Sequence, residues 1–262
     1  MPQTPQPLRL SVQVNSLSKS FNKGQIKALN GINLTFDGGM LHGVIGPAGA
    51  GKTTLLRLML QLLALDQGDI KYFANDQLAD FAAVSADIAY MPEQQSLYAD
   101  LSIREHLDFF ASMYGITPKV YEQKRKELLA MTRLGDFLDR PAGKLSGGMY
   151  KKLGLMCALL RSPRLILLDE PTNGVDPISR REFWDILHQA TKDQITIIMT
   201  TAYMDEAERC EKVHLMEDGL LIGSGEPAKL LETAKVDNFD AYFIARALGD
   251  KTRSEPLTKG AL

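Results

Sequence analysis

The residues best suited to chemistry lie in one glycine-rich segment, Gly46-Pro47-Ala48-Gly49-Ala50-Gly51-Lys52-Thr53-Thr54. It lies between an apolar, strand-like run at 41–45 and a helix-like run at 55–65. Glycines let backbone N–H groups converge on a polyphosphate, because a Cβ would block the approach or forbid positive φ angles. The helix N-terminus favours phosphate, Lys52 adds a full positive charge, and the Thr53 hydroxyl can ligate Mg²⁺. The segment therefore predicts a phosphate-binding loop, and the complete G-x-x-x-x-G-K-T pattern disfavours a turn that only packs.

Two acids form a second candidate centre. Asp169 and Glu170 directly follow the fully apolar run 165–168. Such a run is typical of a buried parallel strand, whose carboxyl end opens into the ligand crevice. Asp169 is suited to holding Mg²⁺ through water, and Glu170 to polarising an attacking water. Paired acids are usually only a solvated strand end, but the separate phosphate loop favours the catalytic interpretation.

A third segment, Leu145-Ser146-Gly147-Gly148-Met149, has the composition of an exposed helix start. Ser146 is a good N-cap residue, and the two glycines leave the first N–H groups of the helix accessible. The segment predicts a second anion site. A plain helix cap would be the better interpretation if the other motifs were absent.

Phe21 lies ahead of the phosphate loop, in a stretch that we expect to be a connecting loop. An aromatic residue on a loop often only covers the edge of the core. A purine bound near its phosphates needs a stacking partner, so we expect Phe21 to contact the base.

Strand-like and helix-like segments alternate along the chain, which indicates a largely parallel sheet covered by helices. Such a sheet would position the residues described above. We expect strands at 10–14, 26–36, 41–45, 69–73, 88–91, 165–168, 195–200, 213–216 and 220–222. Helical periodicity predicts helices at 55–65, 101–114, 120–134, 149–160, 178–190, 204–210, 227–234 and 239–248. The prediction is a single α/β domain over 1–248, with an inserted helical subdomain at about 96–163 and a flexible tail at 249–262.

Composition narrows the class of protein further. The 262 residues carry a formal net charge of −2, which provides no long-range attraction to nucleic acid or to an anionic bilayer. No apolar run reaches the ~18 residues of a membrane-spanning helix, and residues 1–7 lack the order of a signal peptide. Cys157 and Cys210 have no metal-site spacing, which favours buried free thiols in a reducing compartment. We therefore expect a cytosolic protein that reaches a membrane only through a protein partner.

The segments GPAGAGKTT, LSGGM, LILLDEP and NGVD, in this order, resemble the nucleotide-binding subunit of an ATP-binding-cassette (ABC) transporter. The likeness covers residues 10–248. It implies a P-loop NTPase core with an antiparallel β subdomain, and a dimer of identical or different cassettes. Each of two ATP molecules would lie between one chain's Walker A loop, 46–54, and the other chain's Ser146, Gly147 and Gly148.

The resemblance also implies roles for individual residues. Phe21 would stack on adenine, Glu170 would be the catalytic base, and Asp176 would contact the second cassette beside the water. The helical insertion would dock the coupling helices of a membrane permease in a groove near Leu97 and Tyr98. The chain would then be peripheral on the cytoplasmic face of the membrane, with ATP and Mg²⁺ as its ligands.

Two positions depart from the family pattern. The switch histidine should precede the run 203–207, yet position 202 is Ala202. Where the family has a glutamine after Met91-Pro92, this chain has Glu93, with Gln94 next. Losing one preorganised polar contact can cost on the order of 10²–10³ in rate, whereas Glu93 can still ligate Mg²⁺. We therefore expect intact ATP binding with slow or asymmetric hydrolysis.

Three functions fit these features to different degrees. The leading one is the ATPase motor of an exporter, because the LSGGM, SLYADLS and YMDEAE segments resemble cassettes of the drug and multidrug (ABC-2) type. The alternative is a weakly or non-hydrolytic regulatory cassette, paired with a competent one. A soluble translation- or DNA-associated cassette is disfavoured. Such proteins resemble tandem cassettes or carry long coiled coils, whereas this chain has one phosphate loop and neither feature.

Overall fold

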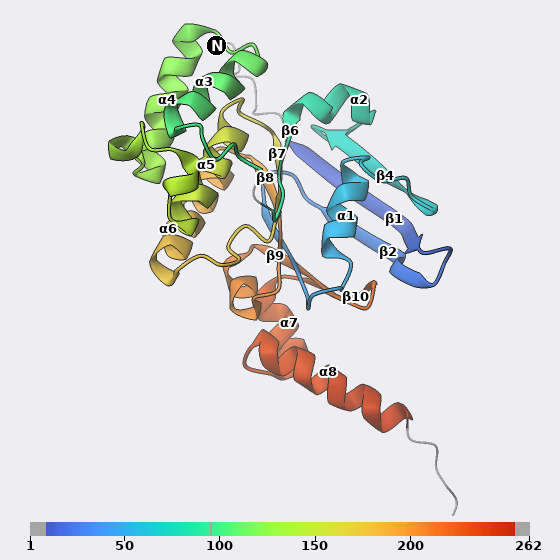
Figure 1. Cartoon of the computed structure of the whole chain (residues 1–262). Helices are drawn as coiled ribbons and strands as arrows, with labels where there is room; N and C mark the ends of the chain where they lie inside the picture. The colour runs from blue at the N-terminus through green and yellow to red at the C-terminus, as the bar shows by residue number, and fades with distance from the viewer. Residues whose placement is uncertain (1–8, 95, 255–262) are drawn as a thin grey trace, which may run out of the picture.

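The computed structural model describes residues 9–94 and 96–254 of the chain (Figure 1). A four-stranded antiparallel sheet has the order β2-β1-β4-β5. Its strands are β1 (Leu10–Phe21), β2 (Ile26–Phe36), β4 (Gln67–Ala74) and β5 (Gln77–Ala79). It forms the antiparallel β subdomain that the resemblance implies.

A six-stranded sheet, in the order β10-β9-β3-β8-β7-β6, forms the centre of the molecule. Its strands are β3 (Leu41–Ile45), β6 (Ile88–Met91), β7 (Leu165–Asp169), β8 (Thr196–Thr201), β9 (Lys212–Glu217) and β10 (Leu220–Gly225). Only β10 runs antiparallel to its neighbour. Every residue of β3, β7 and β8 is buried, as expected for apolar strands covered on both faces.

Helices fill the two sides of the six-stranded sheet (Figure 1). On one side, α1 (Lys52–Met59) packs between the two sheets, in a core that joins Leu55 and Leu56 to Val44 and Leu167. On the other side lie α3 (Ile103–Met113), α4 (Pro118–Thr132), α5 (Gly147–Leu159) and α6 (Pro177–Lys192). A short α2 (Phe81–Val84) precedes β6, and α7 (Pro227–Ala234) and α8 (Phe239–Ser254) end the described chain.

The helical insertion shares a hydrophobic core with the six-stranded sheet. Leu107 and Met156 of the insertion belong to the same buried cluster as Ile166 and Leu168 of β7. The insertion thus lies directly on the sheet that carries Asp169. The single-domain boundary at 1–248 remains a prediction.

Some predicted elements differ in extent. Residues 55–65 were expected to be one helix, but α1 ends at Met59, because Gln61 adopts a left-handed φ of 53°. β1 continues to Phe21, so Phe21 ends a strand instead of lying on a loop. The segment expected as a helix at 204–210 is a 3₁₀-helix, Met204–Arg209. α8 continues to Ser254 where a tail was expected from residue 249, and residues 1–8 and 255–262 lie outside the described part.

The expectations for the cysteines and for membrane spans can be compared with the described residues. Cys157 and Cys210 are both buried free thiols, and burial raises the pKa of Cys157 to about 12. Among residues 9–94 and 96–254, no helix has the length and apolar character needed to cross a membrane.

Two histidines are stacked inside the sheet. His42 of β3 and His214 of β9 are fully buried, and His42 Nδ1 lies 3.3 Å from His214 Nε2. The remaining ring nitrogens bind the Asp37 carbonyl (3.0 Å) and the Ser224 hydroxyl (2.9 Å). Burial is the main cause that lowers the pKa of both imidazoles, and the Lys212 ammonium lowers the pKa of each further. For His42, the charges of Asp37 and Glu211 act in the opposite direction.

Acid is expected to destabilise the fold through this pair. Below the unfolded-state pKa of 6.5, the unfolded chain binds protons that folded His42 and His214 exclude. The free energy of unfolding should therefore fall with decreasing pH by up to about 2.7 kcal/mol per pH unit for two such groups. Denaturant unfolding from about pH 7.5 to about pH 5.5 measures this slope, because this range brackets the ordinary histidine pKa of about 6.5. A His214→Gln variant should have a shallower slope, and an equal slope would contradict the assignment.

Candidate nucleotide-binding site

The glycine-rich loop connects β3 to α1, and its glycines are required by space and by conformation. Gly49 and Gly51 have φ angles of +83° and +100°. A Cβ on Gly51 would lie 2.3 Å from the Ala28 carbonyl oxygen, and a Cβ on Gly46 would lie 2.1 Å from that of Met216. Larger residues would therefore push the loop away from β2 and β9.

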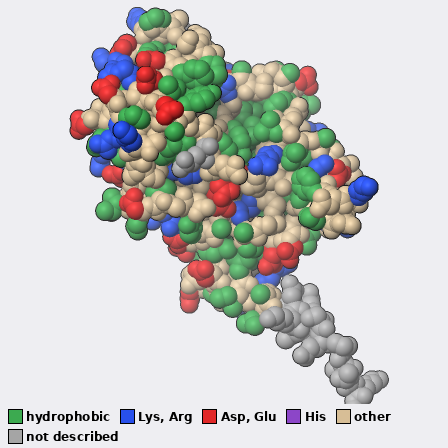
Figure 2. Space-filling view, viewed as in Figure 1, with side chains coloured by type: hydrophobic (Ala, Val, Ile, Leu, Met, Phe, Trp, Pro, Cys, Tyr) green, Lys and Arg blue, Asp and Glu red, His purple; other side chains and the backbone are tan. Residues whose placement is uncertain are grey.

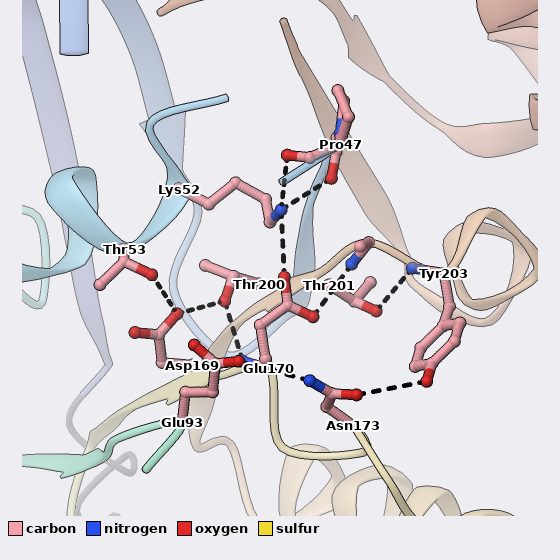
Figure 3. A network of polar contacts seen from close by, with 12 residues as sticks. Pro47, Lys52, Thr53, Glu93, Asp169, Glu170, Asn173, Thr200, Thr201 and Tyr203 are labelled. Carbon is pink, nitrogen blue, oxygen red and sulfur yellow. Dashed lines mark hydrogen bonds and ion pairs between the residues drawn. The ribbon is translucent and has the colours of Figure 1, made fainter. Parts of the chain in front are cut away.

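Lys52 is held at the first position of α1 by three oxygens (Figure 3). Its Nζ donates to the carbonyls of Gly46 (2.7 Å) and Pro47 (3.0 Å) and lies 3.0 Å from Glu170 Oε1. The side chain is 5% exposed. A nearly buried cation therefore lies between the loop and Glu170, the acid that follows β7.

Asp169 is the centre of a hydroxyl cluster. Its Oδ1 accepts hydrogen bonds from Thr53 Oγ1 (2.9 Å) and Thr200 Oγ1 (2.7 Å). Its Oδ2 accepts one from the Tyr90 hydroxyl at 3.4 Å. Burial, and then the Asp169 charge, raise the pKa of Tyr90, which keeps that phenol protonated. The sequence motifs indicated Thr53 and Asp169 but missed Thr200 and Tyr90, which other strands of the sheet supply.

Glu170 has an unusual backbone conformation, with a φ of +45°. Its N–H donates to both the carbonyl (3.1 Å) and the hydroxyl (3.0 Å) of Thr200. Its carboxylate bridges Lys52 and the backbone N–H of Ala202, which donates to Oε2 at 3.0 Å. A non-glycine residue at positive φ costs on the order of 1–3 kcal/mol, and such strain concentrates at functional sites.

Glu93 reaches the same region from the turn after β6. Its Oε1 accepts a hydrogen bond from Asn173 Nδ2 at 3.3 Å, and its carbonyl accepts one from Lys151 Nζ at 3.1 Å. Burial lowers the pKa of Lys151, while the charges of the nearby acids oppose that shift. Glu93 lines the pocket described next, whereas the exposed Gln94 does not.

These groups surround a pocket of about 440 Å³. It is lined by Ile26, Lys27, Ala28, residues 48–54, Glu93, Glu170, Asn173, Ala202 and Tyr203. The pocket thus brings together most of the phosphate loop with Glu93 and Glu170, whereas the buried Asp169 reaches it only through its hydrogen bond with Thr53. Phe21 lies outside the pocket lining, in a neighbouring depression that shares Lys27, with Lys19 Nζ 5.6 Å from its ring centroid.

The second predicted anion site lies apart from this pocket. Ser146 caps α5 by accepting the Met149 N–H at 3.3 Å, and both Ser146 and Gly147 are exposed. Gly148 is buried against α6, where a Cβ would lie 2.2 Å from the Ser179 Cβ. Asp176 caps α6 by accepting the N–H of Ser179 (3.0 Å), a bond that holds the pKa of Asp176 below its usual value. Ser146, Gly147, Gly148 and Asp176 thus lie at the adjoining starts of α5 and α6, outside the lining of the chain's own pocket.

The fold and the site define an ATP-binding cassette. The sequence profile described as "ABC transporter" matches residues 29–173, more than half of the chain. The chain belongs to the ABC transporter family, whose ATP-binding cassettes hydrolyse ATP coupled to transport. The predictions of the family and of the α/β P-loop fold are confirmed.

Curated relatives carry names that refer to multidrug transport, Nod factor export and daunorubicin resistance. The chain is 42% identical over 222 residues to the probable multidrug ABC transporter ATP-binding protein YbhF of Escherichia coli (strain K12), covering 85% of this chain and 38% of that protein. It is 33% identical to the Nod factor export ATP-binding protein I of Rhizobium sp. (strain N33), covering 86% of this chain and 73% of the relative. It is 32% identical to the daunorubicin resistance ATP-binding protein DrrA3 of Streptomyces coeruleorubidus, covering 95% and 78%.

Solved structures agree with this assignment. An ATP-binding subunit of an ABC transporter superposes with a TM-score of 0.77 at 26% identity, covering 89% of this chain and 98% of that one. The cbiO1 protein of Clostridium perfringens, part of the ABC transporter complex cbiONQ, gives 0.75 at 25% identity, covering 84% and 90%.

Proposed function

We propose that the chain is the ATP-binding and ATP-hydrolysing motor subunit of an exporter, acting as a cassette dimer on a separate membrane permease. The observation that carries the proposal is that Lys52, Thr53 and Glu170 line one pocket. The buried Asp169 lies behind them and accepts the hydrogen bond of the Thr53 hydroxyl. The loop N–H groups and Lys52 bind the phosphates, and Glu170 accepts a proton from the attacking water as general base.

A magnesium ion fits the side chains at this site. Thr53, Asp169 and Glu93 offer hydroxyl and carboxylate oxygens, which are the ligands that Mg²⁺ prefers. The ion would neutralise part of the phosphate charge during transfer. Glu93 adds a negative charge to this set, and Lys151, which binds the Glu93 carbonyl, supplies a compensating positive one.

The position of the second anion site supports the proposed dimer. Ser146, Gly147 and Gly148 face solvent or α6, so they complete a nucleotide site only on another cassette. Asp176 lies beside them on the same surface. The second cassette is a copy of this chain or a similar one.

A permease is the proposed partner of the helical insertion. Tyr98, Phe109 and Met113 are 58%, 42% and 55% exposed, and the rings of Tyr98 and Phe109 are in edge contact. Figure 2 shows hydrophobic side chains gathered on the part of the surface around α3. Docking there would hold the chain at the cytoplasmic face of a membrane. The names of the relatives favour an exporter of the drug type.

Sedimentation velocity with and without Mg-ATP tests the proposal. We expect ATP to convert the chain from monomer to dimer and Ser146→Glu to remain monomeric, because an added carboxylate repels the phosphates bound by the partner cassette. ATP should still bind to the chain's own pocket. Ser112→Glu, an exposed serine on α3, is the matched control and should dimerise normally. A Ser146→Glu variant that dimerises like the wild type would contradict the proposed interface.

A weakly hydrolytic regulatory cassette is a second candidate. Ala202 favours it, because only its backbone N–H contacts Glu170 and its methyl group offers no polar contact to the pocket. Such a chain would bind ATP, turn it over slowly and pair with a competent cassette. The turnover of an Ala202→His variant separates the two candidates.

A further inference from the structure

Tyr203 lies beside the nucleotide pocket, and the proposed function gives it no role. It lines the pocket together with Asn173 and Glu93. The Tyr203 hydroxyl donates to Asn173 Oδ1 at 3.4 Å, and Asn173 Nδ2 donates to Glu93 Oε1 at 3.3 Å (Figure 3). The three residues follow β8, β7 and β6, respectively. This chain of contacts therefore links three loops at the carboxyl edge of the parallel sheet.

The ring of Tyr203 is held from its other side by Arg180. The guanidinium carbon lies 4.5 Å from the ring centroid, which is close enough for a cation–π contact. Arg180 Nε donates to Glu206 Oε1 at 2.7 Å, and Nη2 donates to Asp205 Oδ1 at the same distance. Glu206 is fully buried and also accepts a bond from Trp184 Nε1 at 3.1 Å. Tyr203 is thus fixed by its ring to a buried anchor and by its hydroxyl to Asn173.

Glu93 is the member of this chain that needs positioning. It is exposed, and an exposed glutamate loses considerable rotamer freedom when its carboxylate is held in one place. Lys151 fixes the backbone of Glu93 from α5, but the side chain is held by Asn173. The orientation of the carboxylate therefore depends on the asparagine amide, which Tyr203 orients.

We propose that Tyr203 is a positioning residue that acts through Asn173 to hold the Glu93 carboxylate at the mouth of the nucleotide pocket. The inference rests on the proposed ATPase function, in which the Glu93 carboxylate would help hold the magnesium ion. Preorganisation of this kind lowers the reorganisation needed at the moment of reaction. Tyr203 would thus contribute to the site next to Ala202, whose methyl group offers no polar atom to the pocket.

A double-mutant cycle tests this role. Tyr203→Phe removes the hydroxyl and keeps the ring on Arg180, so kcat should fall about 5-fold, the equivalent of one neutral hydrogen bond. KM for ATP, and ATP affinity measured by calorimetry in EDTA, should not change. In a Glu93→Ala background, the same substitution should cause no further loss, because the group that it positions is absent. Equal losses in both backgrounds, or a parallel rise in KM, would overturn the proposal.

Controls separate this inference from a folding defect and from failure of the proposed function. Tyr121→Phe, which removes a hydroxyl bonded to Asp108 on the helical insertion, should retain wild-type kcat. The melting temperature of Tyr203→Phe should match that of Tyr121→Phe. If the wild-type chain hydrolyses Mg-ATP and Tyr203→Phe equals it, only this inference fails. If the wild-type chain neither binds nor hydrolyses Mg-ATP, the proposed function fails as well.

Discussion

Glu170→Gln is expected to lower kcat for ATP hydrolysis by at least about 100-fold, the lower end of the usual contribution of a general base. The amide has nearly the same shape but cannot accept the proton of the attacking water. It can still accept the Ala202 N–H bond that positions Glu170 Oε2 at 3.0 Å, so the loop after β8 should be preserved. Phosphate release from the purified chain with its permease, or alone, measures the loss.

ATP affinity separates a catalytic role of Glu170 from a structural one. Lys52, which lies 3.0 Å from the Glu170 carboxylate, loses a negative neighbour in the variant and keeps its charge for the phosphates. Calorimetric affinity for ATP should therefore be retained or improved. Glu208→Gln, an exposed acid of the same chemistry, is the matched control and should leave hydrolysis unchanged. Weakened ATP binding by Glu170→Gln would instead indicate a structural role.

Ala202→His is expected to raise kcat by about 10-fold if hydrolysis is limited by a missing polar contact, since such contacts are worth up to 10²–10³ in rate. Ala202 lines the pocket, and its backbone N–H already binds Glu170. A side chain added at this position is therefore introduced beside the Glu170 carboxylate. Turnover at saturating ATP measures the gain.

The control for this gain is Ala202→Leu, which adds comparable bulk without a polar atom. It should give no increase, because filling space cannot hold a water or a phosphate oxygen. If Ala202→His turns over ATP at the wild-type rate, the site does not lack this contact, and the weakly hydrolytic alternative loses its support. A high wild-type rate that Glu170→Gln abolishes would argue against that alternative in the same way.

The strand, turn and helix around the glycine-rich segment could be predicted from the sequence because the arrangement is local. Residues 46–54 are contiguous, and the turn between β3 and α1 positions their N–H groups and supplies two of the three oxygens that hold Lys52. The positions of Asp169 and Glu170 could also be predicted, because they follow the apolar run 165–168 and a strand of a parallel sheet ends at the carboxyl edge of that sheet.

Contacts between distant segments could not be predicted in the same way. Thr200, Asn173 and Tyr203 reach the site only because β8 lies beside β7, and no spacing in the sequence shows this pairing. The one available signal was the Thr200-Thr201 pair, where a buried strand ends in hydroxyl residues.

Where the predicted bounds of a helix or strand were wrong, the cause is local. Phe21 was expected on a loop, yet it pairs with Ile26 in an irregular antiparallel ladder, whose register shifts obscure the alternation of a strand. The apolar run 55–65 suggested a long helix, but the exposed Leu62 and Leu65 lie beyond the end of α1. Apolar character alone did not distinguish buried helix positions from the exposed turn that follows.

The close contact between Gly148 and Ser179 has a consequence for how the surface around them can evolve. It fixes the start of α5 against the start of α6, and these two helices carry Ser146 and Asp176, respectively. Neither residue can change its position independently, because any side chain larger than hydrogen at 148 would separate the helices. A neighbouring cassette would therefore contact the two groups as one rigid surface. A substitution at position 148 that displaces one group would also displace the other.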